Sequence, residues 1–280
     1  MKVFTKVYSL QNYLSNINKS KLIGFVPTMG ALHKGHLSLI KRAQSENDII
    51  VVSIFVNPTQ FDKKEDLVTY PRTQQEDLDL LNSINCDVVF IPLTEEVYLE
   101  KVESQNFNFG GLEKVMEGSF RDGHFDGVGT VVKRLFEIVK PTNAYFGEKD
   151  FQQLQIIKKM VEIENIPINI IGCDIFREDD GLAMSSRNTR LNKKQRKDAP
   201  LIYQTLLKAQ KLFPNNSIRD VKEMVKNTFK NNTNLKLEYF EITDIETLTP
   251  ILSKNKNIKY RGFIAVFADT VRLIDNIALN

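Results

Sequence analysis

The first 174 residues alternate between short apolar runs and longer segments in which apolar residues recur at helical spacing. The apolar runs are mostly continuous, which is typical of strands covered on both faces. Two of the helical segments are followed by a proline, Pro141 and Pro167, which acts as a stop signal. This alternation predicts a parallel sheet with crossover helices. The expected strands are 22–26, 49–56, 88–91, 144–146 and 168–171, and the expected helices are 35–44, 74–84, 127–139 and 151–164.

From about residue 175 the pattern changes to helices followed by runs that alternate apolar and polar residues. The expected helical parts are 193–212 and 218–230, and the alternating runs are 235–242, 260–268 and 270–277. Alternation predicts an antiparallel sheet with one solvated face. The expected fold class is therefore α/β, with a parallel-sheet N-terminal domain at 1–174 and a smaller α+β domain with an antiparallel sheet at 175–280.

A strand, a glycine-containing turn and a helix are expected within 21–41, KLIGFVPTMGALHKGHLSLIK. Pro27 is expected to close the strand, and Gly30 allows the backbone to turn or to approach a ligand. His33 and His36 then lie near the first turn of the helix, where backbone N–H groups lack helical partners and attract anions. The stretch suits a polyphosphate.

Three further segments place polar groups where strands are expected to end, at the edge where parallel sheets bind ligands. In 55–61, FVNPTQF, Gln60 offers both a donor and an acceptor. In 145–154, YFGEKDFQQL, Lys149 lies at a helix start, where a positive charge is unfavourable unless an anion is nearby. In 177–188, the hydroxyls of Ser185 and Ser186 and the guanidinium of Arg187 can bind phosphate oxygens.

Of two other motifs, one has two possible interpretations and the other does not match the binding motif that it resembles. Glu76 and Asp77 near a helix start either complement the helix dipole or bind Mg²⁺, which takes one or two protein carboxylates beside phosphate oxygens. Gly127 and Gly129 suggest a dinucleotide-binding loop, but the third glycine and the preceding strand are missing.

Composition excludes several classes of protein. With 42% hydrophobic and 26% charged residues in a chain of 280, the protein is of ordinary globular type. No run approaches the roughly 20 apolar residues of a membrane span, and the N-terminus lacks a secretory signal, so a cytoplasmic location is expected. Cys86 and Cys173 lie in apolar runs and are expected to be buried, reduced thiols. The net charge of +3 is too small to indicate a nucleic-acid partner, and the basic segments 193–197 and 254–259 lack aromatic residues that would stack bases.

The motifs together resemble one enzyme family. The string VPTMGALHKGH (26–36) is similar to the signature of pantothenate synthetases, which belong to the HxGH nucleotidylyltransferase-like group. The segments FVNPTQF, YPRT (70–73), RDGHFDGV (121–128), FGEKDFQQL and MSSR (184–187) resemble its other motifs in order. This sequence departs from the family pattern at Glu76, often aspartate, at Asp122, where the family has proline, and at Phe176, often valine.

The resemblance implies a Rossmann-like N-terminal domain and a C-terminal lid. It also implies ATP-dependent condensation of pantoate with β-alanine through pantoyl adenylate, giving pantothenate, AMP and pyrophosphate. The implied ligands are ATP, Mg²⁺ and the two small acids, with a homodimer as the assembly and neither nucleic acid nor membrane as partner. Two alternatives stay open: another HxGH nucleotidylyltransferase, and an RNA-binding protein with a synthetase-like fold.

The resemblance also implies the roles of individual residues. The catalytic residues would be His33, His36 and Lys149. The implied ATP-binding residues are Met29, Gly30, Ala31, Leu32, His33, Lys34, Gly35, His36, Gly147, Glu148, Lys149, Asp150, Phe176, Met184, Ser185, Ser186 and Arg187. The implied pantoate and β-alanine residues are Pro27, Thr28, Asn57, Gln60, Arg121, Val128, Val131, Val132 and Gln153, with Gln153 pairing with Gln60 around pantoate. Asp77 and Glu76 are the implied metal ligands.

Overall fold

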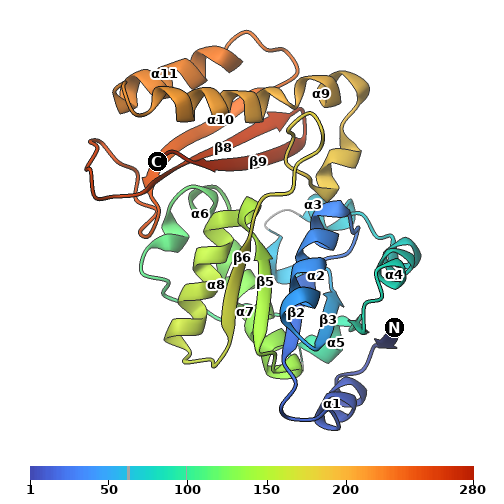
Figure 1. Cartoon of the computed structure of the whole chain (residues 1–280). Coiled ribbons are helices and arrows are strands. Elements are labelled where there is room, and N and C mark those ends of the chain that lie inside the picture. Colours follow the sequence, from blue (N-terminus) through green and yellow to red (C-terminus); the bar gives the residue numbers. More distant parts are fainter. Residues whose placement is uncertain (62–63, 99) are drawn as a thin grey trace. The chain divides into compact units, whose positions relative to one another are not determined.

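A computed structural model describes residues 1–61, 64–98 and 100–280 of the chain. The chain divides into two compact units (Figure 1). The first comprises Met1–Glu113, Glu117–Glu148 and Gln153–Asp174, and the second comprises Lys114–Met116, Lys149–Gln152 and Ile175–Asn280. Two short segments that precede Asp174 in the sequence thus pack with the C-terminal unit.

The first unit is built on a six-stranded parallel sheet with the strand order β1-β4-β3-β2-β5-β6. Its strands are β1 (Lys2–Phe4), β2 (Ile23–Thr28), β3 (Ile49–Ile54), β4 (Val88–Phe90), β5 (Asn143–Gly147) and β6 (Asn169–Cys173). The expected parallel sheet is confirmed. The edge strand β1 was not expected, because three residues are too few to show a pattern.

Helices cover both faces of this sheet (Figure 1). On one face, Ile40 of α2 (Lys34–Glu46) and Leu81 of α4 (Gln74–Ser83) share a buried cluster with strand residues such as Val26. On the other face, Phe136 of α7 (His124–Val139) packs edge-on against Phe25, with 6.2 Å between the ring centroids. Burial on both faces explains why the strands read as continuous apolar runs.

The remaining helices of the first unit are short, apart from α1 and α8. The helices are α1 (Val7–Ser15), α3 (Lys64–Val68), α5 (Thr94–Val97), α6 (Glu117–Phe120) and α8 (Phe151–Ile163), and η1 (Pro58–Gln60) is a 3-10 turn. Two further 3-10 turns, η2 (Leu112–Lys114) and η3 (Glu148–Asp150), begin in the first unit and end in residues that belong to the second.

The strand boundaries differ from expectation at Pro27. Strand β2 continues through Pro27 to Thr28, whereas the sequence predicts an end before the proline. The ladder between β2 and β5 pairs only Gly24 and Phe25 of β2, so the missing N–H of Pro27 falls beyond it. Strand β3, in turn, ends at Ile54 rather than Val56.

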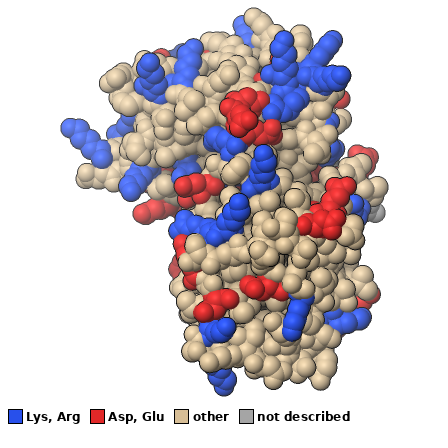
Figure 2. Space-filling model, turned by 45° about the vertical axis from the view of Figure 1, so that its right-hand side comes forward, with Lys and Arg blue, Asp and Glu red and all other residues tan. Residues whose placement is uncertain are grey.

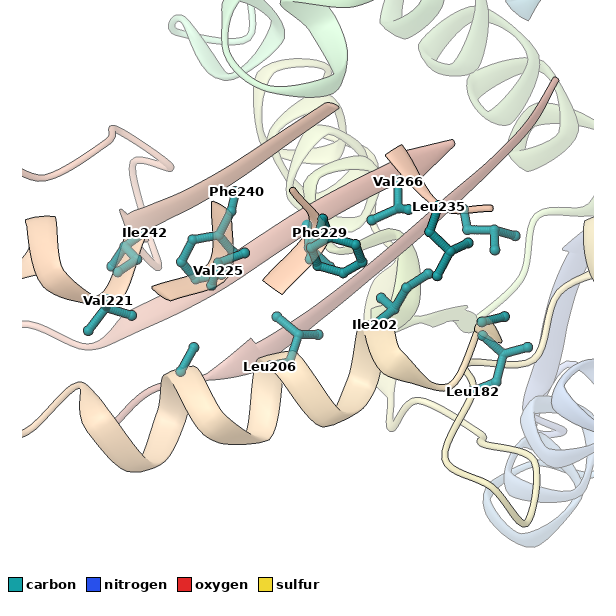
Figure 3. Packing of buried hydrophobic residues seen from close by; sticks show 14 of the residues in the cluster. Leu182, Ile202, Leu206, Val221, Val225, Phe229, Leu235, Phe240, Ile242 and Val266 are labelled. Carbon is teal, nitrogen blue, oxygen red and sulfur yellow. The ribbon is translucent and has the colours of Figure 1, made fainter. Parts of the chain in front are cut away.

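The second unit contains a three-stranded antiparallel sheet of order β7-β8-β9, which confirms the expectation for the C-terminal part. Its strands are β7 (Lys236–Asp244), β8 (Tyr260–Ala268) and β9 (Val271–Ala278), and its helices are α9 (Lys193–Asp198), α10 (Leu201–Leu212) and α11 (Ile218–Phe229), with the turn η4 (Ser186–Arg190). Leu206 of α10 and Val225 of α11 pack with Phe240 and Val266 of the sheet in one buried cluster (Figure 3). Pro200 divides the expected helical part 193–212 into α9 and α10, because it lacks the N–H that would continue the first helix.

Charged side chains of both signs lie on one face of the protein (Figure 2). On the face seen in Figure 2, acidic and basic side chains are interspersed among uncharged ones. Among the described residues, no helix combines the length and the apolar character needed to cross a membrane.

Candidate active site

The strand order reverses between β2 and β5, which are neighbours in the sheet although β3 and β4 lie between them in the sequence. Ligands of open parallel sheets bind outside the carboxyl ends of the strands at such a point. Here those ends are Thr28 and Gly147. The segment 29–36 follows one of them and Glu148 follows the other.

The turn after β2 has an unusual backbone that Asp77 holds in place. Gly30 and Ala31 have positive φ angles of 81° and 48°. One carboxylate oxygen of Asp77 accepts the N–H of Ala31 at 2.9 Å, and the other accepts the N–H of Leu32 at 2.7 Å. A Cβ at residue 30 would lie 2.9 Å from Asp77 Oδ2, so the close approach requires glycine.

The two histidines form a compact pair at the start of α2. Their ring centroids are 4.0 Å apart and the ring planes differ by 31°. His33 precedes the helix, and its backbone N–H donates to Nδ1 of His36 at 3.3 Å. Because Nδ1 of His36 accepts, the proton of the neutral ring is on Nε2, which therefore serves as a hydrogen-bond donor.

The loop after β3 orients Gln60. Asn57 is 1% exposed, and its amide donates to Gln60 Oε1 at 3.2 Å and to the Gly127 carbonyl at 3.1 Å. The Tyr98 hydroxyl donates to Asn57 Oδ1 at 2.6 Å, and burial raises the pKa of Tyr98, so that hydroxyl stays protonated. With Oε1 engaged by Asn57, Gln60 has its NH₂ group as the donor end. That group lies 2.8 Å from the Sδ atom of Met29, the first residue after β2.

His124 and Arg121 support the backbone of the same loop. The His124 Nδ1 atom lies 2.8 Å from the Gln60 carbonyl oxygen, and its Nε2 lies 3.0 Å from Arg121 Nη1. A carbonyl only accepts and a guanidinium only donates, so His124 is neutral with its proton on Nδ1. These contacts give His124 a structural role. Its partner, the Gln60 carbonyl, is 64 residues away in the sequence, so no local motif indicates the contact.

The start of α7 approaches η1 closely. A Cβ added at Gly127 would lie 2.4 Å from the Thr59 carbonyl oxygen, so only glycine lets the helix lie this close. The adjacent valines of the expected pantoate pocket, Val128, Val131 and Val132, are all buried. The sequence excludes a dinucleotide-binding role for Gly127 and Gly129, and helix packing explains the first of these glycines.

In the second unit, Lys149 lies in η3 with its ammonium 3.7 Å from Asp150 Oδ1. Only 17% of the Lys149 side chain is exposed, compared with 47% for Asp150. Its backbone is held by the antiparallel sheet, because Asn276 donates to the Lys149 carbonyl at 2.9 Å.

Hydrogen bonds within the segment 176–188 of the second unit hold its backbone. Arg177 and Ala183 form an isolated antiparallel bridge, and the Met184 N–H donates to the Phe176 carbonyl at 3.0 Å. Ser185 caps η4 by accepting the Arg187 N–H at 3.3 Å. The backbone from Phe176 to Arg187 thus carries five of the expected ATP-binding residues on one short segment.

A family model described as pantoate-beta-alanine ligase matches residues 2–278. The chain belongs to the pantoate-beta-alanine ligase family. A pantothenate synthetase from Christiangramia forsetii is 55% identical over 100% of both chains. The crystal structure of a pantothenate synthetase from Thermus thermophilus has a TM-score of 0.92 and 38% identity, and covers 100% of this chain and 99% of that one. A pantoate-beta-alanine ligase from Francisella tularensis, solved with beta-gamma ATP and beta-alanine, has a TM-score of 0.84 and 37% identity, and covers 100% of this chain and 98% of that one.

Within this ligase fold, the first unit brings three of the expected pantoate residues into contact, namely Asn57, Gln60 and Arg121. Asn57 contacts Gln60 and Gly127 directly, and Arg121 reaches the Gln60 carbonyl at 3.4 Å. Gln153, partly buried on α8, stays a prediction as the partner of Gln60 around pantoate. Asp122, which replaces the family proline, is exposed.

The carboxylates at 76 and 77 have different environments, and their role as metal ligands stays a prediction. Glu76 is exposed, whereas Asp77 is 1% exposed and both of its oxygens accept backbone N–H groups of the turn before His33. The described residues hold no group of three His, Cys, Asp or Glu side chains placed to bind a metal. These contacts favour a structural task for Asp77.

Proposed function

We propose that this chain joins pantoate to β-alanine at the expense of ATP, in two steps through pantoyl adenylate. Membership of the ligase family over the whole chain, with the HxGH turn at the reversal point of the sheet, is the observation that carries the proposal. In the first step a pantoate carboxylate oxygen bonds to the α-phosphorus and the bond to pyrophosphate breaks. In the second step the β-alanine amine bonds to the acyl carbon, AMP leaves with the former carboxylate oxygen, and the amine loses a proton to solvent.

The first step needs alignment and charge neutralisation, because an anion attacks another anion. His36 is proposed to donate from Nε2 to a phosphate oxygen as charge develops, since its Nδ1 is occupied by the His33 N–H. The N-terminus of α2 adds the positive end of the helix dipole beside it. His33 belongs to the same phosphate-handling turn.

Pantoate is proposed to bind beside Gln60. Its carboxylate and hydroxyl groups need donors, and the NH₂ of Gln60 is oriented as a donor by Asn57. Val128, Val131 and Val132 offer an apolar wall for the gem-dimethyl carbon of the substrate.

The residues of the second unit are proposed to act on the nucleotide. Lys149, Ser185, Ser186 and Arg187 supply donors and positive charge for the phosphates, and Asp150 suits the ribose hydroxyls. ATP is proposed to bind as its magnesium complex. The ion would then enter with the substrate and would not need Asp77 and Glu76 as ligands.

The decisive assay supplies ATP and pantoate with and without β-alanine and follows pyrophosphate and AMP separately. Pantoate alone should support ATP–pyrophosphate exchange, and free AMP should accumulate in step with pantothenate only when β-alanine is added. Release of AMP without an amine, or a product that keeps the nucleotide, would contradict the proposal.

The variants His36→Ala and Lys149→Ala should both slow exchange, by about 10²-fold or more, while circular dichroism shows a folded protein. Lys41→Ala, an exposed lysine of α2, serves as the control and should leave exchange unchanged. Near-normal exchange in either test variant would refute that residue's role.

A homodimer and a cytoplasmic location are proposed from the family alone. Sedimentation of the purified chain as a monomer would contradict the first, and recovery of the enzyme outside the cytoplasmic fraction would contradict the second.

A further inference from the structure

The antiparallel sheet of the second unit has helices on one face and the segment 149–152 on the other. Phe151 lies on this second face, with its ring centroid 5.9 Å from that of Phe263 and 4.0 Å from Cζ of Arg261. Phe263 is paired directly across β8 and β9 with Asn276. An aromatic ring and a side-chain amide therefore fix this short segment to the sheet.

Asn276 uses both ends of its amide in this contact. It is 1% exposed, its Oδ1 accepts from Arg261 Nη1 at 2.5 Å, and its Nδ2 donates to the Lys149 carbonyl at 2.9 Å. Arg261 only donates and a carbonyl only accepts, so the orientation of the amide is determined by its two partners.

A buried ion pair holds the strand on which Asn276 lies. Asp275, 3% exposed, receives two hydrogen bonds from Arg177, at 2.6 Å and 3.0 Å. Its Oδ1 also accepts the Asn276 N–H at 2.8 Å, and the Arg177 guanidinium lies 3.6 Å from the ring centroid of Tyr203. Buried bidentate pairs of this kind fix geometry, so the strand offers a rigid base for Asn276.

We propose that Asn276 is a positioning residue for Lys149, and that it acts through the Lys149 carbonyl to place the ammonium against the phosphates of ATP. The inference rests on the proposed role of Lys149. A lysine side chain is long and flexible, so its position depends on where its backbone is held. Asn276 is proposed to act only through the Lys149 backbone and not on a reacting atom.

A double-mutant cycle on the full-length enzyme tests the inference, with pantoate-dependent ATP–pyrophosphate exchange as the readout. Asn276→Ala should lower kcat about tenfold or more, because displacements near 1 Å have large effects on rate. The KM for pantoate should stay unchanged, because pantoate binding does not involve Lys149. In the Lys149→Ala background, Asn276→Ala should cause no further loss.

The outcomes distinguish the proposed role of Lys149 from that of Asn276. If Lys149→Ala exchanges at the normal rate, the proposed role of Lys149 fails. If Lys149→Ala is slow but Asn276→Ala is normal, or slows the reaction by the same factor in both backgrounds, the positioning role of Asn276 is refuted.

Asn280→Ala is a matched control. Like Asn276, the Asn280 side chain accepts one hydrogen bond, from the Tyr260 N–H at 2.7 Å, and donates one to a backbone carbonyl, that of Ile258 at 2.9 Å. It should leave kcat unchanged. If Asn276→Ala does not fold, Asn276→Asp replaces it: the aspartate keeps the acceptor for Arg261 and removes the donor to Lys149, so normal exchange in this variant would also refute the inference.

Discussion

The buried carboxylate of Asp77 illustrates how one residue determines local backbone geometry. Two backbone N–H groups of the turn before His33 have this side chain as acceptor, and Thr73 Oγ1 lies 3.3 Å from it. Ala31, with a positive φ of 48°, needs such compensation because non-glycine residues rarely adopt that conformation.

Asp77→Asn should therefore destabilise the enzyme and slow adenylation. An asparagine offers one acceptor and sets an NH₂ group against the other backbone N–H, so the free energy of unfolding should fall by about 1–3 kcal/mol. Urea unfolding in the presence of a metal chelator measures this loss, and ATP–pyrophosphate exchange measures the effect on the turn.

The neighbouring acid supplies the control, because Glu76 is exposed and Glu76→Gln should change neither quantity. A magnesium ligand would behave differently. If Asp77→Asn leaves stability in chelator unchanged and regains full exchange at high Mg²⁺, then Asp77 binds the metal and the structural interpretation is wrong.

The sequence could indicate Asp77 but not its task. An acidic residue in the first turn of a helix is visible in the sequence, whereas its hydrogen bond to Ala31 joins residues 46 apart. The same holds for Tyr98 and Asn57, which are 41 apart. Local motifs predicted the strand–turn–helix arrangement at His33 and His36, because both lie within one continuous stretch.

At the scale of elements, the contact between α7 and η1 shapes the loop that carries Gln60. The Gly127 carbonyl accepts from Asn57, and the helix start lies against the Thr59 backbone. Any side chain at residue 127 must push these two elements apart.

Gly127→Ala should thus raise the KM for pantoate and lower the free energy of unfolding by about 1–3 kcal/mol, as overpacking does in well-packed interiors. Substrate titration and urea unfolding measure the two effects. Glu137→Ala, an exposed position of the same helix, should change neither by much. An unchanged KM and stability in Gly127→Ala would show that the contact is not tight in solution.

Long elements could be predicted from the sequence better than short ones. Residues 260–268 match β8, and most of the expected helices agree with the structure to within a few residues, because many positions contribute to their periodicity. Helix α1 (Val7–Ser15) was not expected. Strand β1 is too short for a pattern, and the passage of β2 through Pro27 depends on where the neighbouring strand stops pairing.

At the scale of the whole molecule, both cysteines report on the integrity of the first unit. Burial raises the pKa of Cys86 to about 12 and that of Cys173 to about 11. The thiolate is the reactive form, so the folded protein holds both thiols unreactive at neutral pH.

A thiol reagent at about pH 8 should consequently label the native enzyme only as fast as the protein opens, with rapid labelling in urea. Because the unfolded thiols ionise near pH 8.5 and the folded ones do not, this burial stabilises the protein below that pH and progressively less above it. Immediate labelling of either cysteine in the native enzyme would contradict the prediction, and Cys86→Ser and Cys173→Ser identify which thiol reacts.

Residues 149–152 belong to the second unit although they precede residue 174, and this limits where the gene can recombine without disrupting contacts. Phe151 and Gln152 are 5% and 3% exposed, and both partners of the Phe151 ring, Arg261 and Phe263, are encoded more than a third of the chain later. A crossover between relatives at residue 174 would set one parent's Phe151 against the other parent's sheet. The C-terminal unit therefore depends on residues 149–152, which precede residue 174, and homologous exchange should preserve the two as a linked set.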